Sequence, residues 1–204
     1  MQRKKLAVLA SGTGTTFQYI LDASRRLDLF AEIAVLASDR KECGAVLRAE
    51  SASIPVLHLK TKHLDDAISS LERIFIDYNP DLIVLAGYNR ILPSEFVSSH
   101  RERIINTHPA LLPCFGGKGM YGLNVHRAVI ESGAKFSGCT VHFVDTGIDT
   151  GPIIAQAIVQ VAESDTQESL SEKVKALEKP LLIGTITRLL HDPYRIEGKR
   201  VLFT

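Results

Sequence analysis

Residues 5–16 read KLAVLASGTGTT, an apolar run followed directly by a loop of small and hydroxyl-bearing residues. An apolar run without polar alternation indicates a strand covered on both faces, which is typical of a parallel sheet. A helix is expected to begin within the glycine-threonine loop, because Phe17, Ile20 and Leu21 follow at helical spacing. The stretch therefore predicts the strand, loop and helix of an α/β fold.

The same alternation of strand and helix continues along the chain. A second helix is expected after His63, and Pro80 ends it, since a proline cannot continue a helix. A long helix is expected at Ser169–Leu190, with an interruption at Pro180, and the glycine-rich stretch Phe115–Gly122 indicates a loop. Strands are expected at Lys5–Ala10, Ile33–Ala37, Pro55–Leu59, Leu82–Ala86, Arg103–Asn106, Phe136–Val144 and Pro152–Val161. We predict an open, mostly parallel twisted sheet flanked by helices, a Rossmann-like fold.

Length and composition limit the class of protein. The 204 residues, 45% hydrophobic, suit one domain over residues 1–204, with a phosphate-binding half at about 1–100 and a catalytic half at about 101–204. A formal charge of +1 favours small-molecule partners over nucleic acid or an anionic membrane. Three scattered cysteines suit a reducing cytoplasm, and the first apolar run is too short for a membrane span. The sequence leaves monomer and homodimer open.

The loop Ser11–Thr16 has the composition of a phosphate site. It would place backbone N–H groups at the positive end of a helix, where anions bind. It lacks the third glycine of a dinucleotide fingerprint, since Phe17 stands there, and it lacks the lysine of a P-loop. A tight turn with threonine caps explains the same residues equally well.

Asn106 and His108 follow a predicted central strand, and ligands of open α/β sheets gather beyond the carboxyl ends of strands. Two residues apart in an extended segment, the two side chains can point to the same side. An amide can stabilise an oxyanion and a histidine can move a proton, which suits acyl transfer. Asp149, in a glycine-bounded loop, could hold the imidazolium or relay a proton, and His142 could support it. Ordinary turns and a surface histidine are the alternative for each residue taken singly.

Other chemistries have weaker signals. The seven histidines and three cysteines show no metal-ligand spacing, so no metal is expected. Cys114 has no local feature of an activated nucleophile, and Lys118 suits a solvated loop. The sequence therefore points to the amide, imidazole and carboxylate group.

Four segments together resemble the phosphoribosylglycinamide formyltransferase family, within the folate-dependent formyltransferases. They are Ser11–Thr16, Ala86–Leu92, Ile105–Pro113 with its Asn-x-His and Leu-Leu-Pro, and Val141–Val144 followed by Asp149-x-Gly-Pro. The resemblance extends over nearly the whole chain. It implies transfer of a formyl group from 10-formyltetrahydrofolate, as co-substrate and without metal, to the amine of 5-phosphoribosylglycinamide in purine biosynthesis.

The resemblance also implies a role for each matching residue. Asn106, His108 and Asp149 would be catalytic. The substrate glycinamide ribonucleotide would contact Gly14, Thr15, Thr16, Lys175 and Glu178. Folate would contact Asn89, Arg90, Ile91, Leu92 and Asn106, and also Asp145, Thr146, Gly147, Ile148 and Asp149.

Two other classes of function share some of these features. Hydrolysis of 10-formyltetrahydrofolate, or formylation of an initiator tRNA, would use the same three catalytic groups, but an additional domain before or after the core is expected there. Here the first strand is expected at Lys5 and the sequence ends at Thr204. A binding module without chemistry would use only the Ser11–Thr16 loop.

Overall fold

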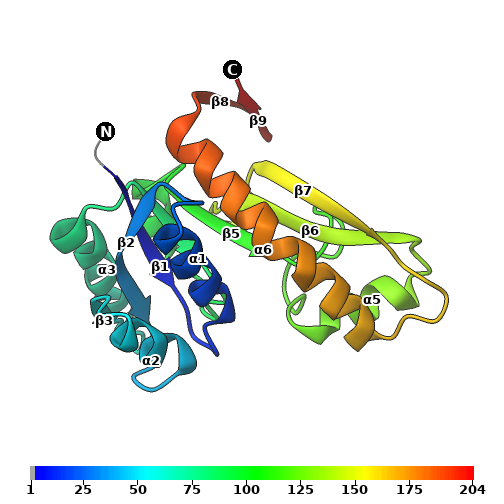
Figure 1. Cartoon of the computed structure of the whole chain (residues 1–204), viewed down its shortest axis with the longest axis horizontal. Helices are drawn as coiled ribbons and strands as arrows, with labels where there is room; N and C mark the ends of the chain where they lie inside the picture. The colour runs from blue at the N-terminus through cyan, green and yellow to red at the C-terminus, as the bar shows by residue number, and fades with distance from the viewer. Residues whose placement is uncertain (1–2) are drawn as a thin grey trace. The chain divides into compact units, whose positions relative to one another are not determined.

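The computed structural model describes residues 3–204 and divides into two compact units, Met1–Ile105 and Asn106–Thr204 (Figure 1). The boundary between the units lies near the expected boundary between the two halves. That both halves form a single domain stays a prediction.

The first unit is built on parallel strands. The strands are β1 (Lys4–Leu9), β2 (Ala31–Ser38), β3 (Val56–His58) and β4 (Leu82–Leu85), in the order β3-β2-β1-β4. Leu6 of β1 pairs with Ile33 on one side and with Leu82 on the other. Most side chains of β1 and all of β4 are buried, as expected for strands covered on both faces. Each of these strands was predicted to within two residues at either end.

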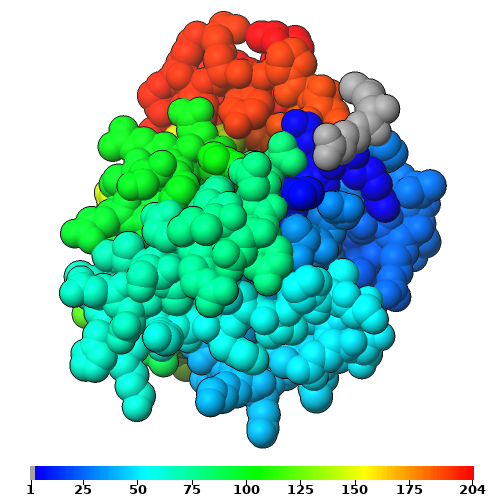
Figure 2. Space-filling model, turned by 90° about the vertical axis from the view of Figure 1, so that its left-hand side faces the viewer, coloured from blue at the N-terminus to red at the C-terminus, as the bar shows by residue number. Residues whose placement is uncertain are grey.

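The helices of the first unit are α1 (Thr15–Arg25), α2 (Gly44–Ser51), α3 (Leu64–Arg73) and α4 (Ser94–Ser99). A π-helical turn, η1 (Ile74–Tyr78), continues α3 and ends at Asn79, whose φ of 43° is left-handed. The predicted helix end before Pro80 is therefore confirmed. The short helices α2 and α4 were not predicted. Figure 2 shows the segment of about residues 40–80, cyan to teal, as one exposed face of this unit.

The chain passes from the first unit to the second within β5 (Ile104–His108). The other elements of the second unit are α5 (Leu123–Glu131), β6 (Phe136–Phe143), β7 (Ile153–Gln160), α6 (Gln167–His191), β8 (Tyr194–Glu197) and β9 (Arg200–Phe203). Strands β6 and β7 are antiparallel, β9 adds parallel to β7, and β8 and β9 form a hairpin. This hairpin was not predicted. Residues 115–122 form no helix or strand, as expected.

The predicted interruption of the long helix at Pro180 is wrong. Helix α6 runs for 25 residues through Pro180 and begins with a capping box at Thr166. A proline inside a helix costs about 3 kcal/mol because it removes a hydrogen bond and crowds the preceding turn. Leu170 and Val174 on one side of Pro180, and Leu182 and Ile186 on the other, are buried. Burial of both halves of the helix outweighs the local cost. Across residues 3–204, no helix is long and apolar enough to cross a membrane.

Candidate active site

Strand β5 ends in the two side chains that the sequence singled out. Asn106 and His108 are two residues apart on this extended strand and therefore lie on the same face. His108 is 3% exposed, and Asn106 is half-buried. The segment that follows is anchored by Thr140 of β6, whose hydroxyl donates to the carbonyl of Ala110 at 2.7 Å and accepts the N–H of Leu112 at 3.1 Å. The backbone that follows His108 is thus fixed to β6.

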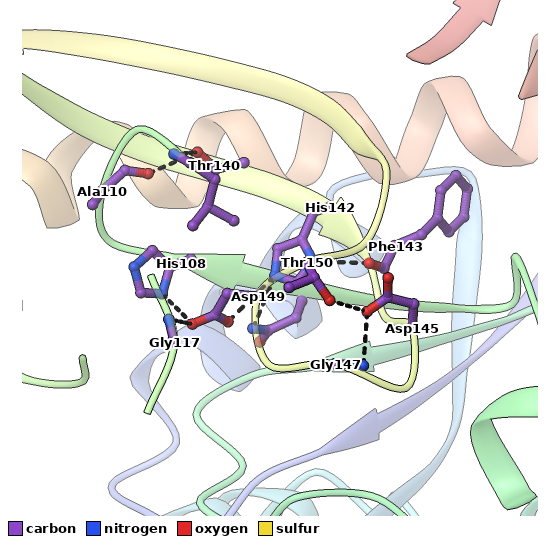
Figure 3. A network of polar contacts seen from close by, with 12 residues as sticks. His108, Ala110, Gly117, Thr140, His142, Phe143, Asp145, Gly147, Asp149 and Thr150 are labelled. Carbon is purple, nitrogen blue, oxygen red and sulfur yellow. Dashed lines mark hydrogen bonds and ion pairs between the residues drawn. The ribbon is translucent and has the colours of Figure 1, made fainter. Parts of the chain in front are cut away.

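Asp149 points at the ring of His108, as Figure 3 shows. Its Oδ2 lies 3.4 Å from His108 Nδ1 and accepts the backbone N–H of Gly117 at 3.0 Å. Asp149 has a left-handed φ of 58°, a conformation that aspartate adopts more readily than most residues. The carboxylate side chain is only 12% exposed, so its attraction to the imidazole is weakly screened by water. The predicted pairing of Asp149 with His108 is present.

The second nitrogen of His108 also has a partner. His108 Nε2 lies 2.8 Å from the carbonyl oxygen of Phe115. Because a carbonyl oxygen only accepts, Nε2 carries a hydrogen in this contact. Phe115, whose carbonyl accepts this hydrogen, has a left-handed φ of 55°. Each ring nitrogen of His108 therefore faces an acceptor.

His142 on β6 orients Asn106. Its Nδ1 donates to the carbonyl of Phe143 at 2.8 Å, which leaves Nε2 free to accept from the Asn106 side-chain amide at 3.3 Å. Burial lowers the pKa of His142 and outweighs the hydrogen bond to Phe143 and the nearby charge of Asp149. The ring is therefore a neutral acceptor, and one amide hydrogen of Asn106 remains for a ligand. Sequence reasoning placed His142 beside Asp149, and the distance of 3.7 Å between His142 Nε2 and Asp149 Oδ1 agrees.

The loop that carries Asp149 is held through Asp145. The carboxylate of Asp145 accepts from the Thr150 hydroxyl at 2.6 Å, from the Gly147 N–H at 3.1 Å and from Lys199 at 3.1 Å (Figure 3). Burial alone would raise the pKa of Asp145, but these hydrogen bonds and the Lys199 charge hold it below its ordinary value. Lys199, between β8 and β9, also donates to the Thr150 carbonyl. Nothing in the local sequence identified Lys199 as a support of this loop.

The Ser11–Thr16 loop leads into α1 in the first unit. Gly14 is the N-cap residue with a left-handed φ of 73°, and no side chain caps the helix. The threonine-capped turn considered as an alternative is therefore absent, and the backbone N–H groups at this end are not used by a side-chain cap. A β-carbon on Gly14 would come within 2.5 Å of Ala45 Cα, so only glycine fits here.

The segment expected to contact folate, Asn89–Leu92, lies shortly after β4. Ser11 Oγ accepts the N–H of Asn89 at 3.0 Å, and the Ser11 N–H donates to the carbonyl of Gly87, just before this segment, at 3.0 Å. Asn89, Arg90 and Ile91 are exposed, and Leu92 is buried. The structure thus brings the predicted phosphate loop and the predicted folate segment together.

Lys175 and Glu178 lie on α6 in the second unit. Lys175 is exposed. The pKa of His126 on α5 is lowered first by burial of the ring and then by the positive charge of Lys175. Glu178 is half-buried. Burial and, after it, the negative charge of Glu178 raise the pKa of Cys139 on β6 to about 12. Both residues belong to a different unit from Gly14–Thr16, so their common role stays a prediction. No cluster of three or more metal-ligating side chains occurs within residues 3–204.

Comparison with known proteins identifies the family. The formyl transferase family model matches residues 4–186. The chain belongs to the formyl transferase family. Among relatives of this family, the chloroplastic phosphoribosylglycinamide formyltransferase of Vigna unguiculata is 41% identical over 195 residues, which cover 94% of this chain and 62% of that relative. The phosphoribosylglycinamide formyltransferase of Mycobacterium tuberculosis is 39% identical over 201 residues, covering 96% and 89% of the two chains.

A solved formyl transferase has the same fold. Glycinamide ribonucleotide transformylase 1 from Symbiobacterium toebii superposes with a TM-score of 0.89 at 37% identity, covering 98% of this chain and 94% of that one. The predicted fold class, a mostly parallel sheet flanked by helices, is confirmed. Asn106, His108 and Asp149 are brought together, whereas Asn89–Leu92 and Asp145–Asp149 belong to different units, so a common folate site stays a prediction.

Proposed function

We propose that this formyl transferase moves the formyl group of 10-formyltetrahydrofolate to the amine of 5-phosphoribosylglycinamide, a reaction of purine biosynthesis. The observation that carries the proposal is the arrangement at the end of β5. Asp149 faces Nδ1 of His108, and the Asn106 amide retains a hydrogen on the same strand face. The names of the Vigna and Mycobacterium relatives support phosphoribosylglycinamide as the acceptor and formyl as the transferred group.

The chemical step begins with attack of the glycinamide amine on the formyl carbon. A nitrogen–carbon bond forms, and the carbonyl electron pair moves to the formyl oxygen. The Asn106 amide and the His108 N–H donate to this oxyanion, as positioned donors do in the tetrahedral intermediates of acyl transfer. In the free protein Nε2 of His108 donates to the Phe115 carbonyl, so the formyl oxygen takes the place of that carbonyl. Asp149 stabilises the imidazolium from the Nδ1 side.

Proton movement completes the reaction. The attacking amine becomes an ammonium and must lose a proton, while N10 of the folate must gain one before it leaves. His108, Asp149 or a bound water carries the proton between them. The bond between the formyl carbon and N10 then breaks, and its electron pair stays with N10. Tetrahydrofolate leaves, and the carbonyl reforms on the substrate.

The remaining assignments belong to the same proposal. Backbone groups of Gly14, Thr15 and Thr16 bind the ribose phosphate, Glu178 binds the ribose hydroxyls, and Lys175 contacts the ribonucleotide. Folate contacts the segments 89–92 and 145–149. We also propose a cytoplasmic protein, monomeric or homodimeric, that uses neither metal nor nucleic acid.

One assay tests the proposal. The protein is mixed with 10-formyltetrahydrofolate, with and without glycinamide ribonucleotide, and release of tetrahydrofolate is followed. Release only in the presence of the ribonucleotide is the expected result. Release without it would indicate a hydrolase, and no release would indicate a binding module. Either of these results would overturn the proposal.

A further inference from the structure

Three neighbouring strands of the first unit end in residues that bind one another. Ser11 follows β1, Asp39 follows β2 directly, and Gly87–Arg90 follows β4. Strand β1 lies between the other two and is parallel to both, so the three carboxyl ends meet at one edge. Asp39 has no role in the site described above.

The Asp39 carboxylate bridges two segments with its two oxygens. Oδ1 accepts from the Ser11 hydroxyl at 2.6 Å, and Oδ2 accepts from Arg90 Nε at 3.1 Å. The side chain of Asp39 is 3% exposed, whereas that of Arg90 is 58% exposed. A carboxylate so deeply buried needs both of its partners, because unpaired burial of a charge is costly.

The bridge also determines how Ser11 binds. The Ser11 hydroxyl donates its only hydrogen to Asp39, so a lone pair of its oxygen accepts the N–H of Asn89. Together with the bond from Ser11 N–H to the Gly87 carbonyl, this sets the position of the loop relative to the segment after β4. Burial and, after it, the charge of Asp39 raise the pKa of Tyr88 in this segment.

We propose that Asp39 is a positioning residue that couples the two substrate segments, Ser11–Thr16 and Gly87–Leu92. It touches neither substrate. It holds the loop that binds phosphate and the segment that binds folate in one fixed arrangement, so that loss of Asp39 weakens both sites together. The inference rests on the proposed function for the identity of the two ligands.

The test measures binding of each ligand by titration calorimetry, with glycinamide ribonucleotide and tetrahydrofolate as the probes, which do not react together. Asp39→Ala is expected to raise both dissociation constants about five-fold or more, the lower end of measured coupling between sites. Asp28→Ala is the matched control, since Asp28 lies in the same unit and pairs with exposed Arg26. It is expected to leave both constants unchanged.

Arg90→Met provides a second variant if Asp39→Ala does not fold. It breaks the bridge from the folate side, so weaker binding of glycinamide ribonucleotide supports the coupling, and unchanged binding overturns it. For a folded Asp39→Ala, a change in one constant alone, or in neither, overturns the proposal. A wild-type protein that binds both ligands but transfers no formyl group would refute the proposed function and leave this coupling standing.

Discussion

His108 has an acceptor beside each ring nitrogen, and Asn106 has one amide hydrogen left after it donates to His142. At the scale of single residues, the N–H of His108 Nε2 and the remaining amide hydrogen of Asn106 are the donors available to an oxyanion. The neutral state of His142 matters here, because a protonated ring could not accept from the Asn106 amide. Burial lowers the pKa of His142 and so preserves that acceptor.

Replacement of Asn106 by alanine removes one oxyanion donor. Loss of such a donor costs about 2.7–4 kcal/mol in the transition state, so we expect turnover to fall roughly 100-fold or more. Steady-state kinetics with both substrates saturating measures it, and Thr107→Ser, at the neighbouring position of β5, is the control. Turnover close to that of the wild type would exclude Asn106 as an oxyanion donor.

Asp149→Asn keeps the shape of the side chain and removes its charge. The amide can no longer stabilise an imidazolium at His108 Nδ1, and it cannot take a proton from the amine. We expect turnover to fall by about 100-fold to 10,000-fold, the range of positioned acid–base groups. The variant should unfold at the same urea concentration as the wild type. A loss of turnover that accompanies unfolding would indicate a structural role instead.

At the scale of elements, two loops contain a glycine that lies too close to neighbouring atoms for any side chain to fit. Gly14 at the start of α1 packs against Ala45 of α2, and Gly151 packs against the Phe143 carbonyl at the end of the Asp149 loop, where an added β-carbon would lie 1.8 Å from the oxygen. Both glycines therefore determine where a loop of the candidate site runs.

Gly14→Ala combines a left-handed φ with a clash against Ala45. We expect a loss of about 1–3 kcal/mol in the free energy of unfolding. Gly12→Ala is the matched control in the same loop, because a β-carbon there meets nothing within 4 Å and its φ is not left-handed. Urea denaturation of the two variants provides the comparison. Equal losses in both would show that the approach to α2 does not matter.

The hairpin of β8 and β9 supports the Asp149 loop through Lys199. The side chain of Lys199 is 67% exposed, so Lys199→Met should change stability by no more than about 1 kcal/mol. It should raise the pKa of Asp145 toward its ordinary value, because a donor and a positive charge are lost. Carboxyl NMR titration measures this. Arg195→Met, which breaks the Arg195–Glu197 pair of the same hairpin, should leave the pKa of Asp145 unchanged.

At the scale of the whole molecule, buried histidines make stability depend on pH. Burial is the main cause that lowers the pKa of His142 and of His126 in the folded protein. Between the lowered folded pKa and the unfolded value of about 6.5, the unfolded chain binds more protons than the folded chain. The free energy of unfolding should therefore decrease as the pH falls below about 6.5.

The variant His142→Asn tests this dependence. It removes one of the two groups, so the decrease between pH 7.5 and pH 5.5 should be smaller than in the wild type. Urea denaturation at several pH values measures it, and His58→Asn, on the exposed side of β3, is the control. An unchanged decrease in His142→Asn would contradict the assignment.

Much of the fold followed from local patterns. The apolar runs of β1 and β4 have no polar alternation, and the strands formed there because both faces are buried. The common face of Asn106 and His108 also followed from strand geometry, since residues two apart on a strand point to the same side. Helix α6 did not follow, because burial on both sides of Pro180 outweighed the local preference.

The sequence by itself determined the α/β alternation, the strand-end position of Asn106 and His108, and the glycine-dependent turn before α1. These depend on contacts within a few residues. Only the tertiary structure decided that Asp149 faces His108, that the Phe115 carbonyl occupies Nε2, and that Asp39 and Lys199 support the loops. Most of those contacts join residues distant in the chain, and the contact of His108 with Phe115 depends on the direction in which the Phe115 carbonyl points. No local pattern of residue types encodes either.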